Sequence, residues 1–344
     1  MLSLANVTER VSRLTVFLAV AALSTTVAAC QAQPRGEEPA QGDVFMGNAS
    51  PAPSPSTGDP AGEVHPFEAV REMDASGDLL AVRTAGELRV GSLDEILGGA
   101  ARAYPLDDVC GDVSANNEAF AVGCGQEIRL FTRAGEDRVS IEGDVPVTAA
   151  AVTGGGEIVA ASRDAKDIRV LRDGEVQRTF PAARETDRLL ATSRSGKPDA
   201  VVRLNNTDTT IQDLDWQGSR QGGTLRAGLG VGGAATGPEG MVLAADATGS
   251  QLLVYNTEDI IRLQMTAPVA EHPWAVAWDT QANLAWITST ATNTAEGYTL
   301  ATGVPVKKKS FATVPDAQSL IALPDGTIVA ASASGKGIQV VSPN

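Results

Sequence analysis

Histidine and cysteine are the side chains of this sequence best suited to acid–base or nucleophilic chemistry, and the chain has only two histidines and three cysteines. His272 stands two residues before Trp274 in the stretch "HPWAVAWDTQANLAWITSTATNTAEGYTLATG", residues 272–303, which holds three of the four tryptophans. An imidazole surrounded by carboxylates and a guanidinium can act as a general acid or base, and an exposed aromatic ring can anchor a ligand. The stretch is therefore either part of a site or one unit of a repeat that is rich in large side chains.

Partners for His272 would have to come from other parts of the chain. If the chain is built from repeated β-units, polar residues just before the first strand of each unit gather at one mouth of the fold: Asp144, Arg184, Asp187, Arg188 and Asp316. No spacing among them forces convergence. We predict that His272, Trp274, Asp187, Arg188 and Asp316 form a ligand-binding group, and we predict no catalytic residue.

Motifs of the common catalytic and cofactor-binding classes are missing. The sequence contains no GxSxG, Walker loop, HExxH or EF-hand pattern, and the paired His and Trp-Asp signature of WD40 repeats is absent. The glycine-rich "GVGGAATG" at 230–237 lacks the lysine and the following helix of a phosphate loop, so we expect it to mark tight turns. No cofactor and no metal site are predicted.

Cys110 and Cys124 are predicted to form a disulfide. The stretch "CGDVSANNEAFAVGC" reads as two short strands around a turn, and a hairpin centred on Asn117 places the two cysteines opposite each other. Facing Cα atoms of an antiparallel pair lie about 4.5–5.5 Å apart, a separation that a disulfide accepts. Closing a loop of this size stabilises a fold by about 3 kcal/mol.

The third cysteine, Cys30, follows the features of an export signal. Arg10 and Arg13 precede the apolar run "LTVFLAVAALSTTVAA", which has 16 residues and is shorter than the roughly 20 of a membrane-spanning helix. The end of the run, Val27-Ala28-Ala29-Cys30, resembles a bacterial lipobox, which implies a diacylglyceryl group on the sulfur of Cys30. An ordinary signal peptide that happens to contain a cysteine is the alternative. We expect residues 1–29 to be removed and a lipid to hold the protein on the membrane.

Residues 30–63 are predicted to be a disordered spacer, because proline, glycine, serine and acidic residues dominate and little apolar surface is available for burial. Without residues 1–29 the chain loses Arg10, Arg13 and Glu9, so its net charge falls from −15 to −16. Such a surface repels phosphate backbones, which argues against nucleic acid as a partner. The expected partners are the membrane, through the lipid, and an envelope protein or a small molecule.

A repeat of about 40 residues runs through 64–344. The strings Ile158–Ser162 and Ile328–Ser332 are both "IVAAS", and each stands between a turn and an alternating strand. The corresponding positions of the seven units are Ala81, Ala121, Ala160, Val201, Ala244, Ile287 and Ala330. Four short strands per unit at this period indicate a β-propeller. We therefore predict an all-β, seven-bladed propeller, and a β-sandwich is the alternative.

Closure of the ring is also predicted. The seventh unit ends at its third strand, 338–342, and the missing outer strand can come from "VHPFEAVREM", residues 64–73. Such pairing would join the two ends of the domain and remove an open sheet edge. The three lysines at 307–309 then fall in an outer strand, either as edge protection or as a docking site for an acidic partner.

Residues 272–303 fit the sixth unit, and their order resembles the YVTN-type propeller repeat. The match rests on Pro273, Val276–Asp279, Asn283, Trp286–Ser289, Asn293-Thr294 and Ala301–Gly303. It covers this one unit; the others share only the rhythm. The whole chain also resembles propeller lipoproteins of mycobacteria and corynebacteria. In this arrangement Trp278 and Trp286 brace the blade, whereas Trp274 lies in a loop.

These resemblances imply two functions of different classes. The lipoproteins imply a cell-surface protein that acts as a non-catalytic binding or scaffolding module at the outer face of the cell membrane. The YVTN-type repeats are related to propellers with lactonase activity, which implies a hydrolase with His272 and acidic neighbours at the channel mouth. We favour the binding module, because the sequence offers a regular scaffold and no convincing catalytic set.

Overall fold

The computed structural model of the chain describes residues 46–56, 58–116 and 118–343. The predicted signal peptide, the lipidation site Cys30 and the spacer up to residue 45 lie outside these residues. Within the described ranges, no helix has the length and apolar character that a membrane span requires.

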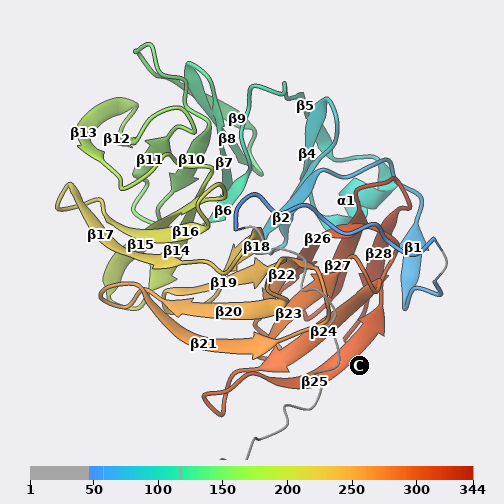
Figure 1. The fold of residues 1–344 in the computed structure, drawn as a ribbon. Helices are drawn as coiled ribbons and strands as arrows, with labels where there is room; N and C mark the ends of the chain where they lie inside the picture. The colour runs from blue at the N-terminus through green and yellow to red at the C-terminus, as the bar shows by residue number, and fades with distance from the viewer. Residues whose placement is uncertain (1–45, 57, 117, 344) are drawn as a thin grey trace, which may run out of the picture. The chain divides into compact units, whose positions relative to one another are not determined.

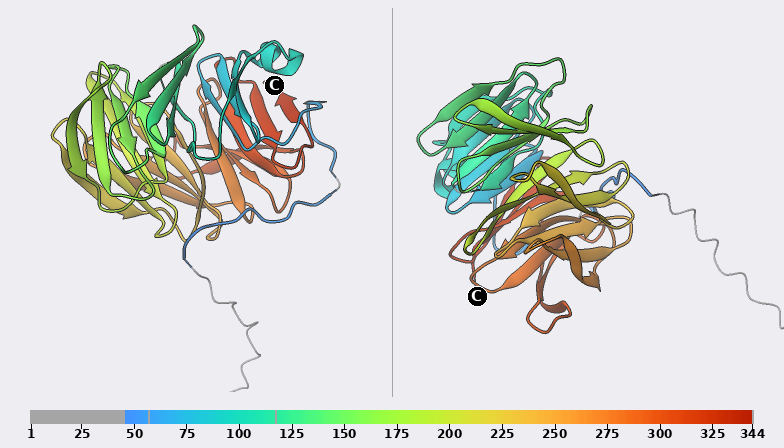
Figure 2. Two further views of the ribbon diagram at one scale, coloured as in Figure 1. Left: turned by 90° about the horizontal axis from the view of Figure 1, so that it is seen from above. Right: turned by 90° about the vertical axis from the view of Figure 1, so that its left-hand side faces the viewer.

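The described chain forms seven four-stranded antiparallel sheets arranged as the blades of a propeller (Figures 1 and 2). From the innermost strand outward, the first four blades are β2 (Glu72–Ser76), β3 (Leu79–Arg83), β4 (Glu87–Gly91) and β5 (Arg102–Pro105); β6 (Ser114–Asn116), β7 (Ala119–Cys124), β8 (Glu127–Thr132) and β9 (Glu136–Ser140); β10 (Ala149–Val152), β11 (Ile158–Ala161), β12 (Asp167–Arg172) and β13 (Glu175–Pro181); and β14 (Arg188–Arg194), β15 (Lys197–Asn205), β16 (Thr210–Asp215) and β17 (Arg220–Arg226).

The remaining blades follow the same order. They are β18 (Val231–Thr236), β19 (Met241–Asp246), β20 (Gln251–Asn256) and β21 (Arg262–Pro268); β22 (Pro273–Asp279), β23 (Leu284–Ser289), β24 (Thr294–Thr299) and β25 (Val306–Ala312); and β26 (Ala317–Ala322), β27 (Ile328–Ser332), β28 (Ile338–Val341) and β1 (Glu63–His65). Each predicted repeat position falls in the second strand of its blade, so the predicted fold is confirmed.

Burial on both faces explains why the second strands are rich in small apolar residues. Successive side chains of a strand point to opposite faces. In β23, Leu284 and Trp286 pack toward blade seven, while Ala285 and Ile287 pack toward blade five. Alternation between polar and apolar residues is therefore lost, and Ala or Val fits where two sheets lie close together.

The predicted closure is confirmed, over a shorter strand. β1 pairs antiparallel with β28, with Glu63 opposite Val340 and His65 opposite Ile338. Pro66 has no N–H for a ladder bond, and the chain runs from there to β2. The helix α1 (Leu93–Gly98) is an insertion between β4 and β5 that begins with a capping box between Ser92 and Glu95.

The predicted disulfide between Cys110 and Cys124 is present, but the predicted strand pairing around it is wrong by one residue. Asn116 lies opposite Ala119 and Ser114 opposite Ala121, so the hairpin is not centred on position 117. Glu118, just before β7, takes a positive φ of 59°, as residues of tight hairpin turns do. Cys110 consequently lies in a turn before β6 rather than in the strand.

Residues 46–56 and 58–62 run across the ends of blades five to seven before β1. The Gly47 N–H donates to the Leu229 carbonyl at 3.1 Å, and Ser54 Oγ donates to the Thr290 carbonyl at 2.8 Å. Farther along, Asn293 Nδ2 donates to the Pro55 carbonyl, and the Ala61 N–H donates to the carbonyl of Ala312. We call this segment, residues 46–56 and 58–62, the N-terminal strap.

Candidate functional site in the propeller channel

The innermost strands surround a cavity of about 260 Å³ on the propeller axis. It is lined by β2, β22 and β26 along most of their length, by the beginning of β14, by β18, and by Ala115 of β6 with the loop before it. All innermost strands run in the same direction, so their first residues converge at one mouth. Side chains from blades far apart in the sequence thereby face one small volume.

Charged residues of three blades meet in this cavity, and we call Glu72, Asp74, Asp112 and Arg188 the channel cluster. Arg188 Nε donates a hydrogen bond to Asp112 Oδ2. The Val113 N–H donates to Glu72 Oε2 at 2.9 Å. The Arg188 and Asp112 side chains remain 26% and 38% exposed, so water in the channel reaches the pair.

The loop that carries Asp112 is held in place by a buried arginine and by the disulfide. Arg83, 7% exposed, donates to the carbonyls of Gly111 at 2.5 Å and Cys110 at 3.0 Å. The disulfide between Cys110 and Cys124 holds the same loop against β7. The position of the Asp112 carboxylate is therefore set by a covalent bond and a buried guanidinium before any ligand arrives.

The carboxyls of the channel cluster differ in pKa. Burial raises the pKa of Glu72 well above its usual value, and the nearby charges of Asp112 and Asp74 add to the increase. Burial also raises the pKa of Asp74 to about 7, although the charge of Arg188 opposes the shift. Burial acts on Asp112 in the same direction but is outweighed by the charge and hydrogen bond of Arg188, so its pKa is lowered.

At neutral pH the channel cluster thus holds an ion pair beside Asp74, which is about half protonated at its pKa of about 7, and Glu72, whose pKa is raised by burial. The pKa of Arg188 is raised, chiefly by the charge of Asp112. A protonated carboxyl donates a hydrogen bond, whereas an ionised one attracts a cation. The arrangement can bind a cationic or hydrogen-bonding group and release a proton in exchange. Among the described residues, no three His, Cys, Asp or Glu side chains form a group suited to a metal ion.

Trp274 and Trp278 line the same cavity from β22, and both are half-buried. The stretch predicted to form tight turns, 230–237, instead contains the innermost strand β18. Its glycines let β22 approach closely, since a Cβ on Gly233 would come within 2.8 Å of the Trp274 carbonyl oxygen. The prediction of turns was wrong because a glycine-rich stretch also serves where two backbones pack tightly.

Two of the five predicted ligand-binding residues line the cavity, namely Arg188 and Trp274. His272 is exposed, takes a positive φ of 47°, and accepts from the Thr290 N–H through its backbone carbonyl. In the described part of the chain, its side chain has no hydrogen bond or ion pair. His272 therefore lies on the predicted mouth without the acidic neighbours that the hydrolase hypothesis assigned to it.

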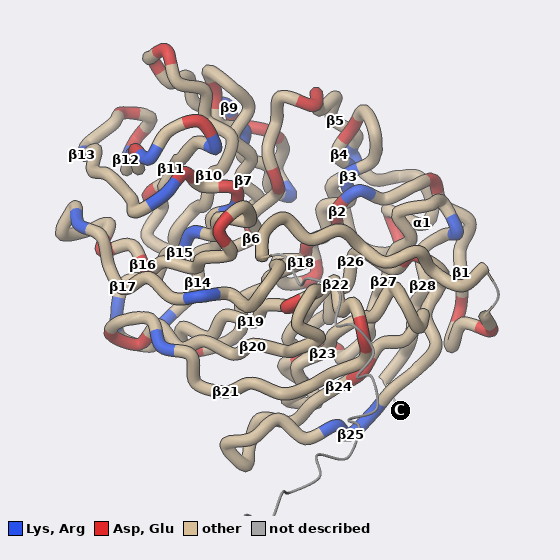
Figure 3. Tube along the Cα trace, viewed as in Figure 1, with Lys and Arg blue, Asp and Glu red and all other residues tan. Residues whose placement is uncertain are grey.

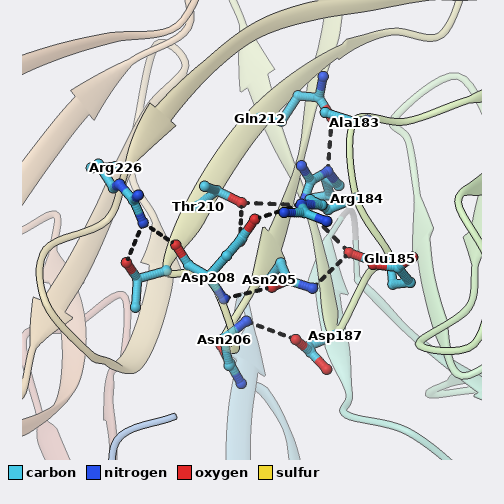
Figure 4. Close-up of polar contacts among 12 residues, drawn as sticks. Ala183, Arg184, Glu185, Asp187, Asn205, Asn206, Asp208, Thr210, Gln212 and Arg226 are labelled. Atoms are coloured by element: carbon cyan, nitrogen blue, oxygen red, sulfur yellow. Dashed lines mark hydrogen bonds and ion pairs between the residues drawn. The ribbon is translucent and has the colours of Figure 1, made fainter. Parts of the chain in front are cut away.

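Asp187 and Arg184 bind neighbouring loops of blade four (Figure 4). Asp187 Oδ2 accepts from the Asn206 N–H at 2.7 Å, and Arg184 Nε donates to Asp208 Oδ2 at 2.9 Å. Beneath them, Asn205 Nδ2 donates to the Glu185 carbonyl at 3.1 Å. These contacts join the loop before β14 to the loop after β15 and give both side chains partners within the blade.

Asp316 and Asp144 lie outside the cavity as well. Asp316 Oδ1 accepts from Gln318 Nε2 at 2.6 Å, and its N–H donates to Ser54 of the N-terminal strap at 2.8 Å. Asp144 is exposed in the turn before β10.

Glu72, Asp74 and Asp112 were missed by the sequence analysis. Glu72 and Asp112 stand at or just before the first strand of blades one and two, the same positions that singled out the other candidates. Applying that criterion to every blade would have found both. Asp74 lies farther along β2 and had no such signal.

No protein-family model and no curated protein matches the chain. Solved structures do match. A chain from the crystal structure of a mitotic checkpoint complex is similar with a TM-score of 0.63 and 15% identity, over 93% of this chain and 100% of that one. The WD40 β-propeller domain of Doa1 is similar with a TM-score of 0.57 and 17% identity, over 81% and 94%. At these identities the likeness shows the fold alone, that of a seven-bladed β-propeller. The YVTN-type repeat stays a prediction.

Proposed function

We propose that this chain is a non-catalytic binding module, tethered to the outer face of the cell membrane by a lipid on Cys30. The observation that carries the proposal is the channel cluster, which brings ionisable side chains of three blades to one mouth of a rigid scaffold. Propellers suit such a role because strand ends and loops converge at the axis while the blades hold them in place.

A ligand with a cationic, hydrogen-donating group fits the channel cluster best. Glu72, Asp74 and Asp112 line the cavity with Arg188 and Arg71; Asp112 is already engaged by Arg188, and Arg71 binds Asp108. Glu72 and Asp74 are then available to accept from an ammonium group, whose charge would favour their ionised forms and oppose the rise that burial causes in both pKa values. The half-buried Trp274 and Trp278 add aromatic surface to the same cavity, and indole rings attract cations.

Calorimetric titration of the full chain carrying Cys30→Ser tests this ligand class. The probes are n-butylammonium, butan-1-ol and butyrate, which share an apolar tail and differ in charge. We expect only butylammonium to bind, with a higher affinity at pH 8 than at pH 6 and release of protons into the buffer. Asp74→Asn should weaken its binding, while Asp144→Asn, outside the cavity, serves as the matched control. Binding of butyrate in preference to butylammonium would contradict the proposal.

The tether is tested separately. Cys30→Ser should move the protein from the membrane fraction to the soluble fraction of the producing cell, because one cysteine carries the whole lipid anchor. Continued tight membrane association of the variant would exclude this role of Cys30. Crosslinking and pull-down from native membranes would then identify any envelope protein that binds the propeller.

Lactonase-like hydrolysis is the second candidate function. It is favoured by Asp74, whose pKa of about 7 suits a general acid or base at neutral pH, and by the neighbouring Arg188. The test is release of acid from a γ-lactone in a pH-stat, with Asp74→Asn as the variant that should abolish it. Turnover that survives this substitution would exclude the channel cluster as its site.

A further inference from the structure

The N-terminal strap lies on loops of blades five, six and seven. Between residues 47 and 55 it contacts the loop before β18, the loop between β23 and β24, and the loop before β26 (blue in the left view of Figure 2). Farther along, a Cβ on Gly58 would come within 3.9 Å of the Thr313 carbonyl oxygen. The residues of blades six and seven that lie against the strap are named the strap-binding surface: Thr290, Asn293, Thr313 and Asp316.

Ser54 joins the strap to both of these blades through one hydroxyl. Its Oγ donates to the Thr290 carbonyl of blade six at 2.8 Å and accepts from the Asp316 N–H, in the loop before blade seven, at 2.8 Å. A hydroxyl suits this place because a single oxygen both donates and accepts. An extended chain with serine or threonine at this position therefore fits the surface, whereas alanine would leave both backbone groups unpaired.

The carboxamide of Asn293 is only half used by the strap. Asn293 Nδ2 donates to the Pro55 carbonyl at 2.8 Å. A residue of an extended chain presents its N–H and C=O on the same side, and a carboxamide offers an acceptor and a donor that can pair with both. Pro55 has no N–H, and within the described residues the buried Asn293 Oδ1 has no hydrogen-bond partner. The strap thus leaves one half of the amide unpaired.

Two hydroxyls of the strap-binding surface also lack a partner in the part of the chain that the structure describes. Thr290 Oγ1 and Thr313 Oγ1 form no hydrogen bond, and both residues are fully buried with the strap in place. A buried polar atom without a hydrogen bond weakens a contact, because it has lost its bond to water and gained none. With Asn293 Oδ1, three such atoms belong to this surface, so the strap is an incomplete match for it.

We propose that the strap-binding surface binds an extended peptide segment of a partner protein, and that the strap is a weaker internal competitor which this segment displaces. The segment carries a serine or threonine in the place of Ser54 and, directly after it, a residue with a backbone N–H in the place of Pro55. That N–H donates to Asn293 Oδ1, a bond that the strap cannot form.

The strap sets the threshold for such a partner. A competitor on the same chain acts at a high effective concentration, so only a segment that binds better than the strap displaces it. A second copy of this chain brings the same Pro55 and gains nothing over the strap already in place, which favours a different protein as the partner. The surface is separate from the channel and does not rest on the function proposed for the channel cluster.

The test uses fluorescein-labelled peptides of residues 48–56 that carry Pro55→Ala or Pro53→Ala. Both changes remove one rigid ring, but only Pro55→Ala restores an N–H beside Asn293, since Pro53 is exposed and forms no hydrogen bond with the described residues. Fluorescence anisotropy with the full chain carrying Cys30→Ser should give about tenfold tighter binding for the Pro55→Ala peptide, or about 1.4 kcal/mol. Equal affinities of the two peptides would overturn the proposal.

Substitution of Asn293 tests the proposed bond from the side of the propeller. Asn293→Ala in the full chain should abolish the difference between the two peptides. Asn283→Ala is the matched control, because Asn283 has a similar positive φ, 54° against 50°, and lies in the exposed turn at the other end of β23. Circular dichroism checks that both variants fold. A tenfold difference that survives Asn293→Ala would overturn the proposal.

Changes in the strap itself test the competition and leave the propeller intact. Ser54→Gly in the full chain removes the hydroxyl that holds the strap, so the Pro55→Ala peptide should bind about tenfold more tightly than it does to the parent. Pro55→Ala in the full chain should have the opposite effect, because it gives the strap the missing N–H. The same affinity in the parent and in both strap variants, or no binding of any peptide to the Ser54→Gly chain, would overturn the proposal.

Discussion

The channel and a cavity at the rim are built from the same four-stranded repeat but have opposite character. At the axis, innermost strands converge and bring charges of different blades into a cavity of about 260 Å³. At the rim, blades six and seven leave a cavity between their outer parts, the outer groove, which is lined by Lys308, Phe311 and Val341 beside the buried Trp286. A charged residue near the axis therefore meets charged residues of other blades, whereas a residue near the rim can border a cavity between two blades.

The charge distribution follows the same division. Acidic residues are spread over many loops of the propeller, whereas the basic run of β25 lies on one outer strand (Figure 3). In the channel, Arg188 is surrounded by carboxyls that lower one another's ability to ionise. In the outer groove, Lys308 and Lys309 line the wall.

Removal of β1 and the N-terminal strap should have the largest effect. A chain that begins at Pro66 loses the ladder with β28 and the strap hydrogen bonds, at about 1 kcal/mol each, together with one wall of the outer groove. We expect a loss of stability on the order of 5 kcal/mol in denaturant unfolding, whereas the residues of the channel cluster are untouched. A truncated protein that unfolds like its parent would contradict ring closure by β1.

Trp286→Ala should be the next most damaging change. The indole is 4% exposed, and truncation of a buried aromatic side chain typically costs about 3–5 kcal/mol. Trp278→Ala, which removes a half-buried indole from the channel wall, is the comparison and should cost less. The measurement is the midpoint of urea unfolding for both variants. Equal losses would mean that the two tryptophans contribute equally to the stability of the fold.

Arg188→Leu should destabilise the protein by about 2 kcal/mol. Loss of one partner of a fully buried ion pair costs about 3–5 kcal/mol, and water in the channel reduces this figure for Arg188 and Asp112. Arg184→Leu is the matched control, because its pair with Asp208 is exposed and should contribute less than about 1 kcal/mol. A smaller loss for Arg188→Leu than for Arg184→Leu would mean that the ion pair in the channel stabilises the fold less than the exposed pair does.

The smallest effect concerns pH. Because the pKa of Asp74 is raised from 3.8 to about 7 in the fold, the folded state binds more protons than the unfolded state between these values. Stability from this group is complete below about pH 4 and is lost as the pH rises through 7. After screening by channel water we expect about 1 kcal/mol. Asp74→Asn should flatten unfolding free energy measured from pH 5 to 8, and an unchanged slope would contradict the shift.

Much of the fold could be predicted because a propeller repeats its signals. The strings at 158–162 and 328–332, and the spacing of the second strands, predicted the number of blades. The missing fourth strand of the seventh unit predicted that the N-terminal strand closes the ring. Strand pairing near Cys110 was harder, since one residue in a turn shifts a register, and the glycines of β18 satisfy a packing need that resembles a turn signal.

The site was predictable only in part. Arg188 was found by its position before an innermost strand, and Glu72 and Asp112 share that position. Convergence of blades one, two and four depends on the radius of the ring, which no local pattern encodes. The outer groove was invisible for the same reason, although the three lysines that border it were noticed. Which of them line the groove is decided by a single-residue bulge in the pairing of β24 with β25.

The N-terminal strap has a mechanical consequence. If the lipid on Cys30 proposed above holds the protein on a membrane, tension reaches the contacts of the N-terminal strap before it reaches β1. The contacts at Gly47, Ser54, Pro55 and Ala61 would be loaded in sequence before the strand that closes the ring. Each can yield and re-form while blade seven stays intact. The strap would thus take up tension by breaking and re-forming its hydrogen bonds before the force reaches the strand that closes the ring.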